Sequence, residues 1–175
     1  MPNGTYGGVR GRKTKVGRKL LRFPPTRLEE NGKLIVTAFV NGVPGRFIVD
    51  TGAPCCVSHS FAAKAGIRDE GRTAQGVDSN GAAVSTSVAN IPSLKLDSVF
   101  TFTRLQAMKW AEGDMLENLH IDGVIGYNLL KQGILKLDAR TGSMTFTSYD
   151  GGLGIDYTRA IPMLPDTYLT LLRVS

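Results

Sequence analysis

The sequence predicts an all-β domain with few and short helices. Short segments rich in β-branched and aromatic residues recur along the chain, and turn-forming Asn-Gly or Gly-rich stretches separate them. Only residues 61–66 and 128–133 combine a helical pattern with a capping residue and a glycine stop. With 175 residues, 42% of them apolar, the chain is long enough for one domain with a hydrophobic core.

The first 28 residues differ in charge from the rest of the chain. They contain eight basic residues and no acidic one, which leaves 13 basic and 15 acidic residues in the other 147. Residues 1–23, with glycines among the cations, are expected to be a disordered basic arm outside the domain, and residues 1–28 are assigned to it. The arm could bind nucleic acid or an anionic surface. A solvated tail or processing segment is favoured, because few aromatic residues there could stack on bases.

The domain, expected over residues 29–148, begins with a hairpin. The segment 33–40 is dense in β-forming residues, Asn41-Gly42 is a typical hairpin turn, and an apolar strand follows. That strand ends in Asp50-Thr51-Gly52-Ala53, which places a carboxylate at the edge of the core. An ionised acid there is costly unless it is paired or hydrogen-bonded. On its own, the triplet is equally compatible with an ordinary turn.

A second motif follows about seventy residues later, where Val124-Ile125-Gly126 runs into Asn128-Leu129-Leu130. With the D-T-G-A turn before it, the chain resembles the retropepsin-like aspartic proteases, the family of the retroviral proteases, over residues 33–147. The resemblance implies a closed β-barrel of the acid-protease fold with a short helix near the end of the domain. It also implies an aspartic endopeptidase with Asp50, Thr51 and Gly52 as its catalytic triplet and a polypeptide as its substrate.

This chemistry requires two carboxylates that share one proton. The chain has one D-T-G triplet, so a homodimer that pairs Asp50 with its symmetry mate is expected, and the monomer should be inactive. One alternative is a lobe of a tandem protease, because residues 149–175 contain a Gly-rich link and a strand-like segment, 168–174, that resembles the start of the domain. That segment could instead complete a dimer sheet. Another alternative is a non-catalytic dimerisation or peptide-binding module of the same fold.

Between the two motifs, residues 75–89 predict a hairpin of small residues with Asn-Gly near its tip. The order of elements in the family places the flap here, although a plain surface hairpin is the alternative. The residues expected to contact the substrate are Ala53, Gly76, Val77, Asn80, Gly81, Val84 and Ile125.

The remaining segments complete the β-rich pattern. Residues 91–96 and 99–103 alternate in period two, and residues 134–137 and 143–146 predict a closing hairpin. Residues 107–119 are expected to be an insertion or short helix. Gly126 should let another segment pass close by. Ser58 or Ser60 should cap the first helix and Asn128 the second.

Several classes of site are not expected. The adjacent cysteines, Cys55 and Cys56, argue against a disulfide framework and indicate core packing rather than redox control. His59 and His120 have no partners at metal-ligand spacing, so neither a metal site nor another cofactor is predicted. No apolar run approaches the length of a transmembrane helix. No signal peptide is visible, and a reducing cytoplasmic compartment is favoured.

Overall fold

Strands make up most of the regular structure in the computed structural model, which describes residues 20–23, 33–77, 81–97, 99–138, 140–141, 143–148 and 153–161. The strands are β1 (Leu20–Phe23), β2 (Ile35–Val40), β3 (Val43–Val49), β4 (Cys56–Val57), β5 (Asp69–Val77), β6 (Ala83–Leu96), β7 (Phe100–Lys109), β8 (Gly123–Ile125), β9 (Ile134–Asp138) and β10 (Ser143–Thr147). The helices are α1 (His59–Lys64), α2 (Met115–Asn118), α3 (Tyr127–Leu130) and the 3-10 turn η1 (Tyr157–Arg159). None of these described helices is long and apolar enough to cross a membrane.

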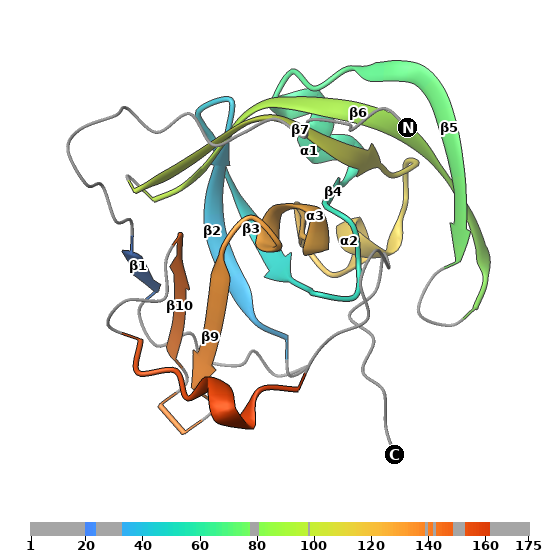
Figure 1. The fold of residues 1–175 in the computed structure, drawn as a ribbon. Coiled ribbons are helices and arrows are strands. Elements are labelled where there is room, and N and C mark those ends of the chain that lie inside the picture. Colours follow the sequence, from blue (N-terminus) through green and yellow to red (C-terminus); the bar gives the residue numbers. More distant parts are fainter. Residues whose placement is uncertain are drawn as a thin grey trace, which may run out of the picture.

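Six strands form a closed barrel (Figure 1). They are hydrogen-bonded in the order β2-β3-β8-β4-β7-β6, and β6 pairs back onto β2 through Phe39↔Lys95 and Val40↔Leu94. Strand β5 extends this sheet beyond β6, outside the closed ring. The prediction of an all-β, closed-barrel fold is therefore confirmed.

The first hairpin and the first helix follow the sequence closely. Between β2 and β3, Asn41 and Gly42 both have positive φ, at 51° and 86°, as a two-residue turn of the type that matches strand twist requires. The hydroxyl of Ser58 caps α1 by accepting a hydrogen bond from the N–H of Phe61 at 3.2 Å. Ser58, one of the two predicted caps, is therefore confirmed, and the helix begins at His59, two residues before the expected start at residue 61.

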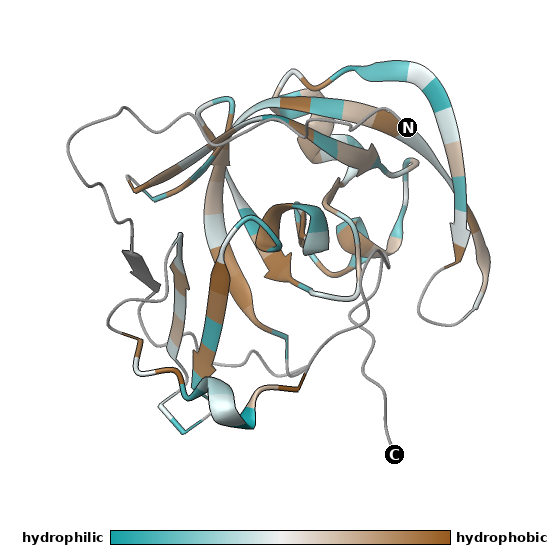
Figure 2. Cartoon of the chain, in the orientation of Figure 1, coloured by the Kyte–Doolittle hydropathy of each residue, from teal (hydrophilic) through white to brown (hydrophobic). Residues whose placement is uncertain are grey.

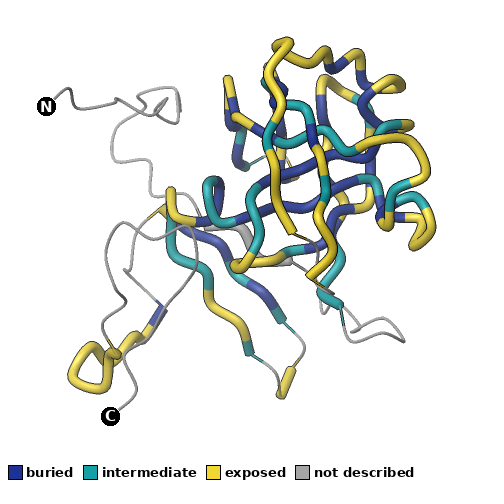
Figure 3. Tube along the Cα trace, turned by 90° about the vertical axis from the view of Figure 1, so that its right-hand side faces the viewer, coloured by how far each residue is buried: buried dark blue, intermediate teal, exposed yellow. Residues whose placement is uncertain are grey.

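The interior of the barrel is filled by aromatic and aliphatic side chains. The ring of Phe47 meets that of Phe61 edge-on, with 5.5 Å between the ring centres, and Phe100 meets Phe146 in the same way at 5.1 Å. Buried residues lie along the barrel strands, whereas loops and turns are mainly exposed (Figure 3). Hydropathy follows the same division, and the exposed strand β5 is largely hydrophilic (Figure 2). Burial of these apolar groups is the main force that holds the barrel closed.

A second, three-stranded sheet has the order β1-β10-β9. Strand β1 pairs antiparallel with β10, from Leu20↔Thr147 to Phe23↔Met144. The expectation that the arm is unstructured as far as residue 23 is therefore wrong for residues 20–23. Their apolar sequence, Leu-Leu-Arg-Phe, suits an added strand even though cations surround it. Residues 1–19 and 24–32 lie outside the described residues.

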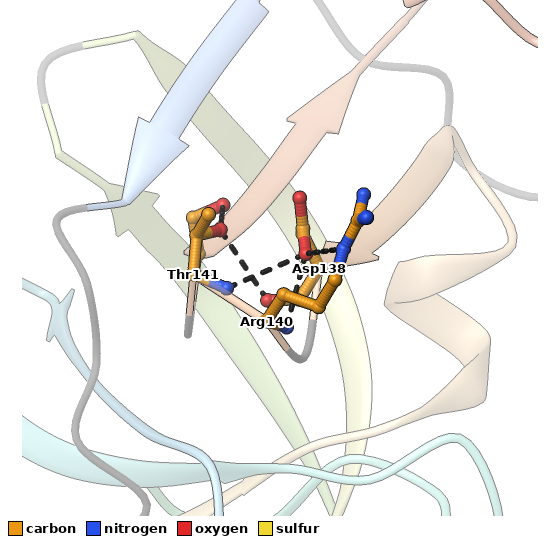
Figure 4. Close-up of polar contacts among 4 residues, drawn as sticks. Asp138, Arg140 and Thr141 are labelled. Carbon is orange, nitrogen blue, oxygen red and sulfur yellow. Dashed lines mark hydrogen bonds and ion pairs between the residues drawn. The ribbon is translucent and has the colours of Figure 1, made fainter.

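The predicted closing hairpin consists of β9 and β10 (Figure 4). In its turn, Oδ1 of Asp138 accepts hydrogen bonds from the N–H groups of Arg140 at 3.0 Å and Thr141 at 3.4 Å. These bonds hold the pKa of Asp138 below its usual value, and the bond from Arg140 has the largest effect. The strand expected over residues 168–174 lies outside the described residues.

Candidate active site

Asp50 follows directly after β3, beside the strand of the second motif. Strands β3 and β8 run parallel, with Val49 opposite Ile125, and the N–H of Asp50 donates to the carbonyl of Ile125 at 3.1 Å. Strand β4 pairs with the other side of β8. Strand β8 therefore lies between the strand that enters the Asp50 turn and the strand that leaves it. The fold thus brings together two motifs that are far apart in the sequence.

Gly126 is the point at which the two motifs approach most tightly. A Cβ atom on this residue would lie 2.2 Å from the carbonyl oxygen of Ala53 and 2.5 Å from the backbone nitrogen of Cys55. The next N–H, that of Tyr127, donates to the same carbonyl of Ala53 at 2.8 Å. Only glycine fits here without displacing backbone, which confirms the expected close passage of another segment.

Asn128 does not cap α3, contrary to the expectation from its sequence position. The cap position is Gly126, which has no side chain to contribute. The side-chain oxygen of Asn128 accepts a hydrogen bond from the N–H of Cys55 at 2.7 Å, and its nitrogen donates to the carbonyl of Gln106 at 2.8 Å. An amide can donate and accept at once, so this side chain links the Asp50 loop to β7 instead of capping the helix that contains it.

The carboxylate of Asp50 is exposed in the single chain, as are its neighbours Thr51 and Gly52. Its Oδ1 accepts a hydrogen bond from the N–H of Gly52 at 2.7 Å. A Cβ on Gly52 would lie 3.3 Å from this oxygen, so glycine keeps the turn uncrowded. The expected cost of burying this acid does not arise, because β3 ends at the surface. The predicted triplet is therefore presented outward, where another molecule can reach it.

Most other described acids have contacts that belong to the scaffold. Asp69 pairs with Lys109 at 2.7 Å, Asp114 caps α2, Glu117 accepts from the N–H groups of Ser60 and Gly113, Asp122 accepts from the N–H of Arg46, and Asp156 caps η1. These contacts hold turns and helix ends in place. They leave Asp50 as the best candidate for a catalytic acid.

The residues expected to contact the substrate divide into two groups. Gly76, Val77 and Val84 lie in the β5–β6 hairpin, and Val77 is 72% exposed although apolar. Gly81 follows with a φ of +80°, and Asn80 lies outside the described residues. This group confirms the predicted hairpin, which is longer than expected because β5 already begins at Asp69.

The second group lies beside Asp50. Ala53 packs against a small cluster that contains Val124, Cys56 and Leu116. Ile125 is 1% exposed and belongs to the barrel core instead. Successive residues of a strand face opposite sides, so Val124 and not Ile125 shares the side of Ala53. The expected contact of Ile125 with substrate is therefore not supported.

Both cysteines are free and buried, at 1% exposure for Cys55 and 4% for Cys56. Burial raises the pKa of Cys55 to about 11 and that of Cys56 to about 12. Both side chains are therefore neutral thiols near pH 7, which supports packing over redox control. In the described part of the chain, no three His, Cys, Asp or Glu residues gather as they would around a metal ion.

The chain is similar to one protein family in sequence and to two solved proteins in structure. A family model described as aspartyl protease matches residues 36–129, which include the Asp50 turn, the hairpin and the second motif as far as Leu129. A retropepsin-like aspartic protease from Rickettsia conorii has a similar crystal structure, with a TM-score of 0.54 and 20% identity over 75% of this chain and 92% of that chain. The retroviral protease-like domain of Ddi1 from Leishmania major matches with a TM-score of 0.43 and 16% identity, over 62% of this chain and 78% of that chain. Among curated proteins, none matches the sequence.

Proposed function

Because the chain belongs to the aspartyl protease family and has the retropepsin-like fold, we propose that it is an aspartic endopeptidase that acts as a homodimer. In this dimer Asp50 of each copy supplies one of the two catalytic carboxylates. The observation that carries the proposal is the position of Asp50, on an exposed turn that backbone hydrogen bonds join to the second motif. Backbone that is hydrogen-bonded to a neighbouring strand can hold a catalytic carboxylate in a fixed position.

The proposed reaction needs a bound water between the two carboxylates. The ionised carboxylate takes a proton from the water while the oxygen of the water attacks the peptide carbonyl carbon. The other carboxyl, which is protonated, donates its proton to the carbonyl oxygen. The resulting tetrahedral diol collapses when one of its hydroxyls gives a proton to the ionised carboxylate. The C–N bond breaks, and the protonated carboxyl donates its proton to the leaving nitrogen. Water and the peptide bond give a carboxylic acid and an amine, so the two carboxyls end with one shared proton, as they began.

The homodimer follows from the number of suitable acids. The sequence contains one D-T-G triplet, and a two-fold axis beside it would place two copies of Asp50 face to face. Two ionised carboxylates held face to face repel each other, which favours a single proton shared between them. The exposure of Asp50 in one chain is compatible with this approach. The carboxylate would become enclosed only when the second copy binds.

The β5–β6 hairpin is assigned the role of a flap over the substrate. Strand β5 is exposed along almost its whole length, and in the described residues its one ladder partner is β6. At the base of the hairpin, Asp69 pairs with Lys109 and the register shifts between Asp69 and Thr73. A hairpin with so few packed side chains can move at low free-energy cost, as a flap must when substrate enters.

Replacing Asp50 by Asn tests the proposal. A peptide library is incubated with the wild-type protein, Asp50→Asn and a matched Asp156→Asn control between acidic and neutral pH, and mass spectrometry detects cleavage. Asp50→Asn should lose hydrolysis because an amide cannot accept or release the shared proton. Asp156→Asn should cleave like the wild type, since Asp156 caps η1.

Circular dichroism and sedimentation separate loss of chemistry from loss of structure. Asp50→Asn should remain folded and dimeric. Cleavage by this variant would rule out Asp50 as the catalytic acid. A wild-type protein that binds peptides without cleaving them would instead be a peptide-binding module.

A further inference from the structure

The thiol of Cys55 connects the loop of Asp50 to the second motif. The N–H of Gly126 donates to Sγ of Cys55 at 3.2 Å, and Sγ lies 3.9 Å from the carbonyl oxygen of Gly126, toward which it can donate. One side chain from the loop thus contacts both polar backbone groups of the glycine at which the motifs cross. The contact is buried on both sides.

This contact matters because buried backbone N–H groups need an acceptor. An N–H that is left without one destabilises the folded protein, and a tightly packed site leaves no room for a replacement water. At Gly126 even a single added carbon would overlap the loop. Burial raises the pKa of the Cys55 thiol to about 11, so the sulfur keeps its proton and can both accept and donate at any pH at which the protein would work.

The thiol contact is one of a series of bonds beneath Asp50. The N–H of Asp50 donates to Ile125, the N–H of Gly126 donates to the Cys55 thiol, and the N–H of Tyr127 donates to Ala53. Successive residues of the second motif are therefore bonded to the start, the end and the middle of the loop 50–55. In this series, the sulfur contact is the one that a side chain of the loop itself provides.

We propose that Cys55 is a positioning residue for Asp50. The thiol of Cys55 holds Gly126 against the loop 50–55 and so fixes the position at which the two Asp50 carboxylates meet. This inference rests on the proposed function, because the position of the Asp50 carboxylate matters for catalysis only if two carboxylates share a proton. Displacement of a catalytic group by about 1 Å can lower the rate about a hundredfold.

Cys56 offers a matched control within the same chain. It is equally a buried, free thiol, but it packs in the small cluster with Leu116 and Val124, and its hydrogen-bond partners are the side chain of Trp110 and the backbone of Val124, away from Gly126. Replacing either cysteine by alanine removes the same atoms from a buried site. Only the change at Cys55 also removes the acceptor for the N–H of Gly126.

The test compares Cys55→Ala, Cys55→Ser and Cys56→Ala by peptide hydrolysis, at concentrations at which sedimentation shows all three to be dimeric. Cys55→Ala should lower kcat about tenfold with KM changed less than about twofold. Cys55→Ser should recover most of the loss, since a hydroxyl also accepts and donates. Cys56→Ala should also lose thermal stability, because it too removes buried atoms, but its kcat should stay within about twofold of the wild type. Equal kcat values for the two alanine variants, or no recovery with serine, would overturn the proposal.

Hydrogen exchange of the Gly126 amide, measured by NMR, provides a readout that does not depend on catalysis. Its exchange should be at least about tenfold faster in Cys55→Ala than in the wild type and unchanged in Cys56→Ala. An unchanged rate in Cys55→Ala would overturn the positioning role. If the wild-type protein cleaves no peptide, the proposed function fails, and the Gly126 amide still shows whether the thiol holds the crossing.

Discussion

The side-chain oxygen of Asn128 accepts a hydrogen bond from the backbone N–H of Cys55 at 2.7 Å, across 73 positions of sequence. The amide nitrogen of the same residue donates to the carbonyl of Gln106 in β7 at 2.8 Å. One side chain therefore joins helix α3, the Asp50 loop and a barrel strand. The loop that presents the candidate catalytic acid is thus held from two sides, by β8 and by α3.

Removal of this amide should destabilise the fold. Asn128→Ala leaves the buried N–H of Cys55 without its acceptor, and we expect a loss of about 1–3 kcal/mol in the free energy of unfolding, measured in urea. Gln132→Ala is the matched control, because Gln132 is exposed and donates to a carbonyl at 3.2 Å; it should cost less than about 0.5 kcal/mol. Equal losses in the two variants would contradict the role given to Asn128.

The crossing at Gly126 should not tolerate a methyl group. The atoms that a Cβ would meet belong to the backbone of residues 53–55, so they cannot rotate away, and Gly126→Ala should cost about 3 kcal/mol or more in unfolding free energy. In Gly76→Ala the nearest atom would be Cγ2 of Val84 at 3.7 Å, and less than about 0.5 kcal/mol is expected. A Gly126→Ala protein as stable as Gly76→Ala would show that the two segments do not pass this closely.

Asp114 should make the protein more stable as the pH falls. Its Oδ1 caps α2, whereas Oδ2 is buried without a hydrogen-bond partner among the described residues. Burial, supported by the nearby charge of Glu117, raises the pKa of Asp114. The folded protein therefore takes up this proton at a higher pH than the unfolded chain does. Stability then rises as the pH falls through the raised pKa, and the gain is complete below the ordinary value for Asp.

Thermal melting at several pH values tests this sign. The melting temperature of Asp114→Asn minus that of the wild type should be more positive at pH 7 than at about pH 3.5, since the variant lacks the charge that burial penalises. Asp156→Asn should behave in the opposite way, because hydrogen bonds from Thr158 lower the pKa of Asp156 and stabilise the fold only while it is ionised. The same trend in both variants would contradict the assignment for Asp114.

Val77 should contribute to substrate binding and little to stability. It is the last residue of β5 and is 72% exposed. If the hairpin closes over a peptide, Val77→Ser should raise KM about fivefold through lost apolar contact, with an unchanged melting temperature. Thr73→Ser, nearer the base of the same strand, should leave KM unchanged. An unaffected KM in Val77→Ser would argue that the hairpin is a plain surface feature.

Local sequence signals predicted much of the fold. The Asn41-Gly42 turn, the serine cap of the first helix and the closing hairpin each depend on residues close together in sequence, and each is found where the pattern places it. The glycine of the second motif was also predictable, since its lack of a side chain indicates close approach. These features need no knowledge of the distant packing.

Features that depend on distant partners could not be predicted in this way. Strand β1 lies within a cationic segment, and its pairing with β10 has no local signal. Asn128 is of a residue type that often caps helices, but its side-chain oxygen accepts a hydrogen bond from the N–H of Cys55, far away in the sequence. The exposure of Asp50 depends on where β3 ends relative to the whole barrel, which strand hydrophobicity alone does not determine.

Subunit mixing tests whether the two catalytic carboxylates are Asp50 of two copies, as we propose. Wild-type protein and Asp50→Asn are mixed in varying ratio at a fixed total concentration at which both are dimeric, allowed to exchange, and assayed for peptide hydrolysis. If both copies must supply Asp50, activity falls as the square of the wild-type fraction, to about one quarter in an equal mixture. Activity proportional to the wild-type fraction, about one half in the same mixture, would show that each chain acts alone and that the two carboxylates do not come from two copies of Asp50.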